Sequence, residues 1–298
     1  MSKATRIRQQ NARQKIAAQR EAERRAERRR RLFITGGSVL AVIVIVVAFI
    51  VIRSLNKPSA AATAGANVRT PLPASVSNAV STVPASTLNT VGAGVIPRVV
   101  SQPLTAGSGA PLISNGKPEM LYIGAEYCPY CAAMRWSMAV ALSRFGTLST
   151  PWHGIHSSSS DVYAHTATLT FYKSGYTSKY LVFTPVENLT VSKAPLQNPT
   201  AAQNAIWAKY EPDPATRGYP FIDFGNKWVI KGPIYDPAVL KGLTWSQIAT
   251  AMRDPSSPVS QSVLGAANYM TAAICKMTNG QPGSVCTSPA VTKVAGKL

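Results

Sequence analysis

The fold is decided by residues 120–131, which read Met-Leu-Tyr-Ile-Gly-Ala-Glu-Tyr-Cys-Pro-Tyr-Cys. A short apolar run leads into Cys128 and Cys131, which are separated by two residues. Apolar side chains then recur at three- and four-residue steps as far as Phe145, the spacing of one face of an amphipathic helix. A strand, a Cys-x-x-Cys pair and a helix in this order are typical of a redox centre.

The predicted position of Cys128 at the start of a helix has a chemical consequence. Backbone N–H groups at a helix N-terminus have no partner within the helix, and their dipoles favour a nearby anion. They stabilise a thiolate and lower the pKa of the thiol. We therefore expect Cys128 to be the nucleophile and Cys131, one turn further along, to be the resolving thiol. Pro129 suits the first helical turn because its missing N–H costs nothing there.

Residues 125–131, Ala-Glu-Tyr-Cys-Pro-Tyr-Cys, resemble the active-site segment of the thioredoxin superfamily, and the Pro-Tyr pair between the cysteines is similar to that of glutaredoxins. The resemblance covers residues 107–255. It implies an α/β fold of three layers with a central mixed sheet. It also implies a cis-proline that opens a strand facing the dithiol, for which Pro220 is the candidate. Gly225-Asn226, which follows, predicts a hairpin turn.

The same resemblance implies a substrate groove beside the two cysteines. Its expected lining consists of Tyr219, Pro220, Phe221, Pro129 and Tyr130. The whole layout also resembles an uncharacterised family of membrane-anchored prokaryotic thioredoxin-like proteins. That likeness indicates a fold more than a function.

One position departs from the thioredoxin pattern. Many thioredoxins have a buried acidic residue six positions before the first cysteine, where this chain has Tyr122. Glu126 lies two residues before Cys128, and we expect it at the surface. The usual proton acceptor for the resolving cysteine is therefore missing or relocated.

The net charge of +19 is concentrated at the start of the chain. Residues 1–31 contain twelve Lys or Arg and three Glu, a net charge of +9, and predict a basic cytoplasmic tail. A nucleic-acid-binding protein would be expected to spread its basic residues over the folded body, so we expect no nucleic-acid partner.

Residues 32–52 predict a transmembrane helix. They include no charged side chain, and 21 residues at about 1.5 Å each span roughly the thickness of the bilayer core. A secretory signal usually has a shorter apolar core of about 7 to 15 residues, although Ala60-Ala61-Ala62 leaves cleavage as an alternative. The basic flank stays in the cytoplasm, so we expect a single-pass membrane protein whose C-terminal domain is extracytoplasmic.

Residues 53–106 are rich in Ala, Ser, Thr, Pro and Val and predict an extended linker. Residues 107–255 form the expected thioredoxin-like domain. Residues 256–298 predict a helix followed by Cys275 and Cys286. We expect these two cysteines to form a structural disulfide, with a second redox pair as the alternative.

Rival interpretations of Cys128 and Cys131 are a zinc site and an inert disulfide. A zinc site needs four ligands at suitable spacing, and His153 and His156 are separated by only two residues within a Ser-rich region. We therefore expect no metal and no other cofactor. The chain also has no Gly-x-Ser-x-Gly motif of a serine hydrolase and no Gly-rich phosphate loop.

The sequence thus predicts a membrane-anchored thiol–disulfide oxidoreductase. Its expected partners are the thiols or disulfides of other proteins, together with a membrane redox protein that recharges the dithiol. The alternative is a non-catalytic thioredoxin-like binding module of the cell envelope, in which the cysteines form a structural disulfide.

Overall fold

The strand that leads to the dithiol lies in the middle of a mixed sheet. This is seen in a computed structural model that describes residues 68–298, all within one compact unit. The central strand is parallel to one neighbour and antiparallel to the other, and its first residues also pair with a short strand in a hairpin. The order across the sheet is β9, β4, β10, β11 and β2. The strands are β2 (Thr105–Ala106), β3 (Ile113–Ser114), β4 (Lys117–Gly124), β9 (Val182–Glu187), β10 (Phe221–Phe224) and β11 (Trp228–Lys231).

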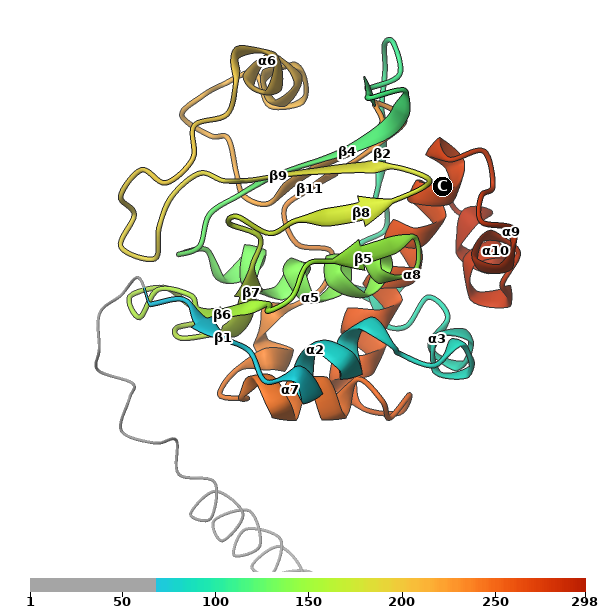
Figure 1. Ribbon diagram of the computed structural model, residues 1–298, viewed down its shortest axis with the longest axis horizontal. Helices are drawn as coiled ribbons and strands as arrows, with labels where there is room; N and C mark the ends of the chain where they lie inside the picture. Colours follow the sequence, from blue (N-terminus) through green and yellow to red (C-terminus); the bar gives the residue numbers. More distant parts are fainter. Residues whose placement is uncertain (1–67) are drawn as a thin grey trace, which may run out of the picture. The chain divides into compact units, whose positions relative to one another are not determined.

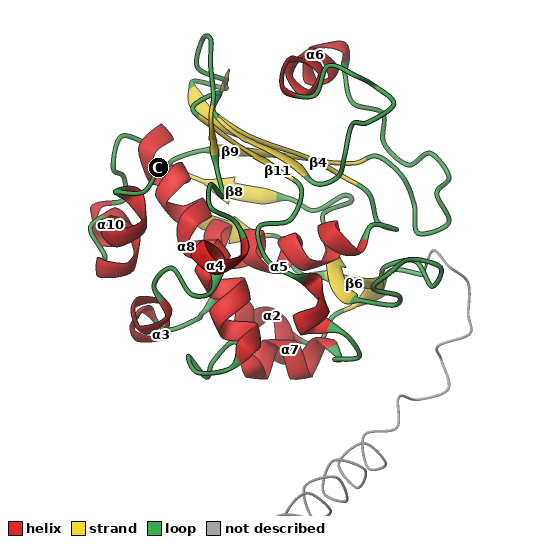
Figure 2. Ribbon diagram, turned by 180° about the vertical axis from the view of Figure 1, so that it is seen from behind, coloured by secondary structure: helices red, strands yellow, loops and turns green. Residues whose placement is uncertain are grey.

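Helices cover both faces of this sheet (Figures 1 and 2). Side chains alternate along β4, so Leu121 and Ile123 pack towards α6 (Ala201–Tyr210). Met120 and Tyr122 belong to the larger core on the opposite face. That core is built mainly on two helices, α5 (Pro129–Ser143) and α8 (Pro258–Met277).

Helix α5, which carries the two thiols, packs between the sheet and α8. Both helices are buried along most of their length. The Ser137 hydroxyl donates a hydrogen bond of 2.8 Å to the Val263 carbonyl, which satisfies a buried polar group between the helices. Because α8 begins after residue 255, the expected domain boundary at residues 255–256 divides what is a single core.

Smaller elements surround this centre. Three strands form a second sheet, in the order β1, β6 and β7, and two more form a ribbon. These strands are β1 (Thr70–Pro71), β6 (His153–His156), β7 (Ala167–Thr170), β5 (Gly146–Leu148) and β8 (Tyr176–Ser178). The remaining helices are α2 (Ala74–Ser81), α3 (Ala85–Val91), α4 (Ile96–Val99), the 3₁₀ helix η2 (Pro237–Leu240), α7 (Trp245–Ala251), α9 (Gly283–Cys286) and α10 (Pro289–Ala295).

The predicted hairpin after Pro220 is confirmed. Strands β10 and β11 pair antiparallel from Phe221 opposite Lys231 to Phe224 opposite Trp228. Gly225 and Asn226 both have positive φ angles, 66° and 58°, as a two-residue turn of the primed type requires.

The expected linker is wrong for much of its described part. Residues 74–99 contain α2, α3 and α4, and these helices pack on the folded body. Val76 and Val80, one turn apart, are each 1% exposed, and Leu88 and Ile96 are also buried. All three helices are short, and the Ser- and Thr-rich sequences of α2 and α3 have low helix propensity, so packing rather than local preference stabilises them. Residues 53–67 lie outside the described part of the chain.

Among residues 68–298, no helix combines the length and the apolar character needed to cross a bilayer. The predicted transmembrane helix at residues 32–52 and the basic tail before it lie outside the described residues.

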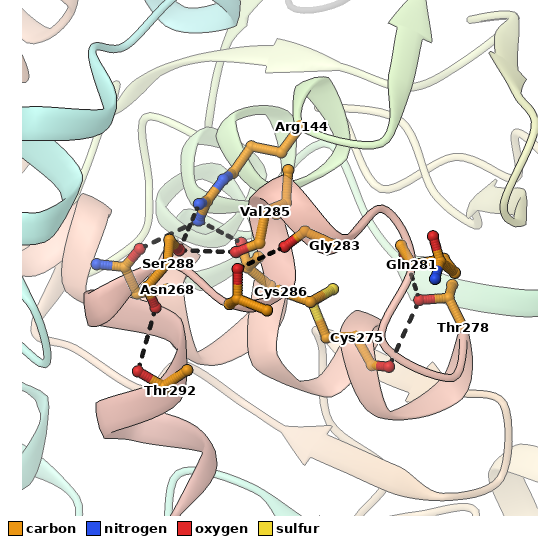
Figure 3. The surroundings of a disulfide bond; sticks show 12 residues. Arg144, Asn268, Cys275, Thr278, Gln281, Gly283, Val285, Cys286, Ser288 and Thr292 are labelled. Atoms are coloured by element: carbon orange, nitrogen blue, oxygen red, sulfur yellow. Dashed lines mark hydrogen bonds between the residues drawn. A yellow bond between two sulfur atoms is a disulfide. The ribbon is translucent and has the colours of Figure 1, made fainter.

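A disulfide attaches the C-terminal segment to the end of α8. Cys275 and Cys286 are bonded, with their Cα atoms 5.5 Å apart, and the bond joins α8 to α9 (Figure 3). Nearby, Arg144 reaches across from the end of α5. Its guanidinium donates to Asn268 Oδ1 at 3.3 Å and to Ser288 Oγ at 3.2 Å. Burial lowers the pKa of Arg144 to about 10. The C-terminal segment is thus held both covalently and by a partly buried cation with neutral partners.

The paired substitutions Cys275→Ala and Cys286→Ala should lower the free energy of unfolding by about 3 kcal/mol, since the closed loop of 11 residues restricts the unfolded chain. Urea denaturation of a fragment of residues 65–298, which form one compact unit, measures the loss. Wild-type protein in a thiol reductant serves as the control and should match the variant. Equal stability of oxidised wild type and variant would show that the bond contributes nothing to stability.

Candidate functional site

Cys128 lies where β4 ends and α5 begins, as the sequence predicted. It is the N-cap of α5, and its Sγ accepts a hydrogen bond of 3.3 Å from the backbone N–H of Cys131. Pro129 occupies the first helical position. Both cysteines are free thiols; Cys128 is 4% exposed and Cys131 is fully buried.

The two thiols are electrostatically unequal. A hydrogen bond from the Cys131 side chain lowers the pKa of Cys128, and backbone N–H groups and the charge of Arg135 act in the same direction against the effect of burial. Burial raises the pKa of Cys131, and the neighbouring Cys128 adds to the rise. Cys128 is therefore the thiol suited to ionise first.

The segment before β10 lies opposite the dithiol. The Cys128 thiol contacts the Tyr219 carbonyl oxygen, with 3.8 Å between sulfur and oxygen. The peptide bond from Tyr219 to Pro220 is cis. Two residues 91 positions apart thus meet at the Cys128 sulfur. They do so because β10 pairs with β4, which brings the segment before β10, including Tyr219, to the end of β4.

The expected groove residues divide into two groups. Tyr130 and Tyr219 are partly exposed, whereas Pro129 and Pro220 are buried. Phe221 is fully buried and packs against Trp207 of α6, with ring centroids 6.4 Å apart. Phe221 therefore belongs to the core beneath α6, and its expected place in an open groove is wrong. The reason is that successive side chains of a strand point to opposite faces of the sheet, so Phe221 is turned to the face opposite Pro220.

Tyr127, Tyr130 and Tyr219 pack against the cluster of Cys128 and Cys131, and Tyr163 joins them through Tyr130; of these four, the sequence predicted only Tyr130 and Tyr219 as groove residues. Tyr127 meets Tyr219 edge to face with ring centroids 6.3 Å apart, and Tyr130 meets Tyr163 in the same way at 6.0 Å. The Lys193 ammonium lies 5.0 Å from the centre of the Tyr127 ring. We call Tyr127, Tyr130, Tyr163 and Tyr219 the tyrosine rim. Tyr163 comes from a Ser-rich loop whose local sequence gives no sign of this position.

Two ion pairs with buried carboxylates lie next to the dithiol. Arg135 of α5 makes a bidentate pair with Glu187 of β9, with N–O distances of 2.8 and 2.7 Å, and neither side chain is exposed. Arg135 also donates to the Ala125 carbonyl oxygen at 2.8 Å. Arg69 pairs with Glu126 in the same bidentate way, at 2.8 and 2.7 Å.

The structure corrects the expected surface position of Glu126. Its side chain is fully buried and accepts a further hydrogen bond of 2.7 Å from the Thr170 hydroxyl. Burial of a carboxylate is tolerated here because a guanidinium and a hydroxyl satisfy its oxygens. Arg69 lies 57 residues earlier in the chain, so no local pattern announces the pair.

The residues that match a known family include this site. Residues 104–276 match the family model described as a domain of unknown function (DUF929). The chain belongs to this family. Searches of curated proteins and of solved structures found no match.

The DUF929 segment contains the whole central sheet, α5, α6 and all of α8 except its last residue. Both thiols, the Arg135–Glu187 pair and Tyr219 fall inside it. Arg69 and Cys286 fall outside it, so one buried ion pair and the disulfide each join the DUF929 segment to flanking residues. Within residues 68–298 no three His, Cys, Asp or Glu side chains are grouped as metal ligands.

The substitution Cys131→Ala should raise the pKa of Cys128, because it removes the hydrogen bond that lowers it most. A thiol is alkylated as the thiolate, so the alkylation rate of wild type should rise through a pH midpoint below the value of about 8.5 for free cysteine. In the variant that midpoint should move to higher pH. The measurement is the pH dependence of iodoacetamide modification, followed by mass spectrometry of the peptide that contains Cys128.

The control for this titration is the double variant Cys275→Ala with Cys286→Ala, which removes two sulfur atoms from the C-terminal segment and should leave the Cys128 midpoint unchanged. An unchanged midpoint in Cys131→Ala would contradict the assignment of the hydrogen bond.

Proposed function

We propose that this DUF929 protein is a thiol–disulfide oxidoreductase that acts on disulfides or thiols of other proteins through Cys128 and Cys131. The proposal rests on one arrangement: the Cys128 sulfur caps α5, interacts with Cys131 and lies 3.8 Å from the backbone carbonyl of Tyr219. A sulfur with a lowered pKa beside a second thiol is the pair that exchange chemistry requires.

In the reducing direction, the Cys128 thiolate attacks one sulfur of a partner disulfide. A bond forms between Cys128 and that sulfur, and the other partner sulfur leaves as a thiolate. Cys131 then loses its proton and attacks the Cys128 sulfur, which breaks the mixed disulfide and releases the second partner thiolate. The partner gains two electrons, and the dithiol becomes a disulfide. In the oxidising direction every step runs in reverse.

A thioredoxin-like three-layer fold is part of this proposal. The sheet order β9, β4, β10, β11 supports it. In this sheet β9 is parallel to β4, β10 is antiparallel to β4, and β11 is antiparallel to β10. The dithiol at the end of β4 and the cis bond before β10 support it as well. The resemblance of residues 125–131 to thioredoxin active sites implies this combination.

A binding module without catalysis is the second candidate. The near-complete burial of Cys128, 4% exposed beneath the tyrosine rim, favours it, because a partner sulfur needs access to the nucleophile. In such a module Cys128 and Cys131 would remain a structural disulfide, and the rim would contact a protein of the cell envelope.

Replacing Cys131 with Ser should trap mixed disulfides between Cys128 and partner proteins, because the resolving step is lost while the attacking thiol remains. The variant is expressed in the native cell, free thiols are blocked with acid and alkylating agent, and adducts are detected on non-reducing gels. Trapped species should disappear on reduction. The matched control, Cys128→Ser, should trap none. A folded Cys131→Ser protein without adducts would favour the binding module.

We also propose that residues 32–52 anchor the protein in the membrane with the DUF929 domain outside the cytoplasm. In a background with Cys128 and Cys131 replaced by Ser, the substitution Val162→Cys, at a residue that is 65% exposed, should give a thiol that reacts in intact cells with a maleimide that cannot cross membranes. A cysteine at Ser2 is the matched control and should react only after lysis. The opposite pattern would place the domain in the cytoplasm.

A further inference from the structure

Two buried donor groups next to the dithiol have no hydrogen-bond partner within residues 68–298. They are the Tyr122 hydroxyl and the Nη1 atom of Arg135. An unpaired buried polar group costs free energy, of the order of 1–3 kcal/mol. Two such groups beside a pair of thiols suggest that they serve a state of the site other than the neutral dithiol.

Tyr122 is fully buried on the face of β4 that meets α5. Its ring packs edge to face on Phe171, with centroids 5.7 Å apart. Its hydroxyl extends past Gly124, where a Cβ atom would lie only 2.0 Å from the hydroxyl oxygen. Glycine at position 124 therefore leaves the space that the hydroxyl occupies at the end of β4, where the dithiol loop begins.

Arg135 approaches the same place from α5, one helical turn after Cys131. Its Nε and Nη2 atoms bond Glu187, and Nη2 also bonds the Ala125 carbonyl. Nη1 is left without an acceptor. The positive charge is held rigidly beneath the dithiol, because both carboxylate oxygens of Glu187 are engaged by it.

Cys131 is the thiol whose charge is felt at both donors, since it contributes to the pKa shifts of Tyr122 and of Arg135. Burial raises the pKa of Tyr122 and the nearby Cys131 side chain adds to the rise, although no hydrogen bond of ordinary geometry joins the two side chains. The Arg135 charge also acts on Cys131. Burial raises the pKa of this thiol, so its thiolate needs compensation when it forms.

The charged and titratable groups around Cys131 come from several elements. Tyr122 comes from β4 and Glu187 from β9, and Cys128 and Arg135 come from α5. Tyr219 comes from the segment before β10. Glu187 carries the negative charge that pairs with Arg135. Of these groups, the Tyr122 hydroxyl is a neutral donor without a hydrogen-bond partner among the described residues, so it breaks no existing hydrogen bond when it donates to a thiolate.

We propose that Tyr122, beside the charge of Arg135, donates a hydrogen bond to the Cys131 thiolate during the resolving step. This inference rests on the proposed exchange function and gives Tyr122 a task within it. Burial raises the pKa of Tyr122 well above its ordinary value, so the phenol keeps its proton and acts as a donor rather than as a base. The proton of Cys131 passes to solvent or to the departing partner thiolate.

The test separates the two thiols with an aromatic disulfide, 5,5′-dithiobis(2-nitrobenzoate). In the first phase the Cys128 thiolate attacks the reagent and releases one coloured thiolate. In the second phase Cys131 attacks the Cys128 sulfur and releases the other, as the Cys128–Cys131 disulfide forms. In Tyr122→Phe the second-phase rate should fall about tenfold, as expected for a lost hydrogen bond to a charged group. The first phase should change less than about twofold, because Cys128 keeps its own donors.

A stability measurement distinguishes this role from a structural one. The Tyr122 hydroxyl makes no hydrogen bond in the dithiol state, so Tyr122→Phe should leave the urea midpoint unchanged or raise it. The matched control is Tyr235→Phe, which removes a buried hydroxyl that donates to the Ala133 carbonyl at 2.6 Å. That control should lower the urea midpoint and leave both release phases unchanged.

Three results would overturn the proposal: an unchanged second phase in Tyr122→Phe, an equal fall in both phases, or loss of folding, which would assign the hydroxyl a structural bond. The pH profile adds a check, since the second phase of the variant should reach its midpoint at a higher pH. The small reagent reports on Cys131 even if no protein partner is trapped by Cys131→Ser. Failure of the exchange function and failure of the Tyr122 assignment are therefore distinguishable.

Discussion

The buried ion pair between Arg135 and Glu187 is the constraint on which the dithiol depends. Both side chains are fully buried, so the attraction between them is offset by the cost of removing two charges from water. The net contribution of the ion pair to stability is therefore small, and its main effect is to fix the position of α5 and of the loop that leads to Cys128. The guanidinium joins α5 to β9 and to the Ala125 carbonyl. Removal of either charge would leave the other buried without a partner.

The second ion pair, Arg69 with Glu126, holds the same segment between β4 and Cys128 at the next residue. Arg135 fixes the carbonyl of Ala125, and Arg69 fixes the side chain of the next residue. The backbone that enters Cys128 is thus held by two guanidinium groups from different parts of the chain. Arg69 immediately precedes β1, which pairs with β6 in the second sheet, and β1 lies beside that sheet in Figure 1. The N-terminal end of the described chain is therefore connected directly to the dithiol loop.

The sequence revealed the parts of this site that are local. Cys128 at the start of α5 and the turn at Gly225-Asn226 follow from neighbouring residues, and both stand where they were predicted. The helices before β2 were missed because each is too short to show a repeated apolar face. Glu126 was misplaced because its partner, Arg69, is 57 residues away. Pairings of this length depend on the tertiary fold, and a single sequence contains no local signal for them.

Different residues set the electrostatics of the site and the access to Cys128. Arg135 and its partner Glu187 lie in the interior, where low polarity strengthens the effect of the Arg135 charge on the two sulfur atoms. The tyrosine rim lies at the surface and carries no net charge at neutral pH, and Lys193 adds one positive charge above Tyr127. A partner that approaches Cys128 first meets aromatic edges, which offer contact area at little entropic cost. Since Cys128 is nearly covered, those rings must move before a partner sulfur can reach it. Under the proposed exchange function, binding of a partner at the rim would therefore control when the buried charges act on the reaction.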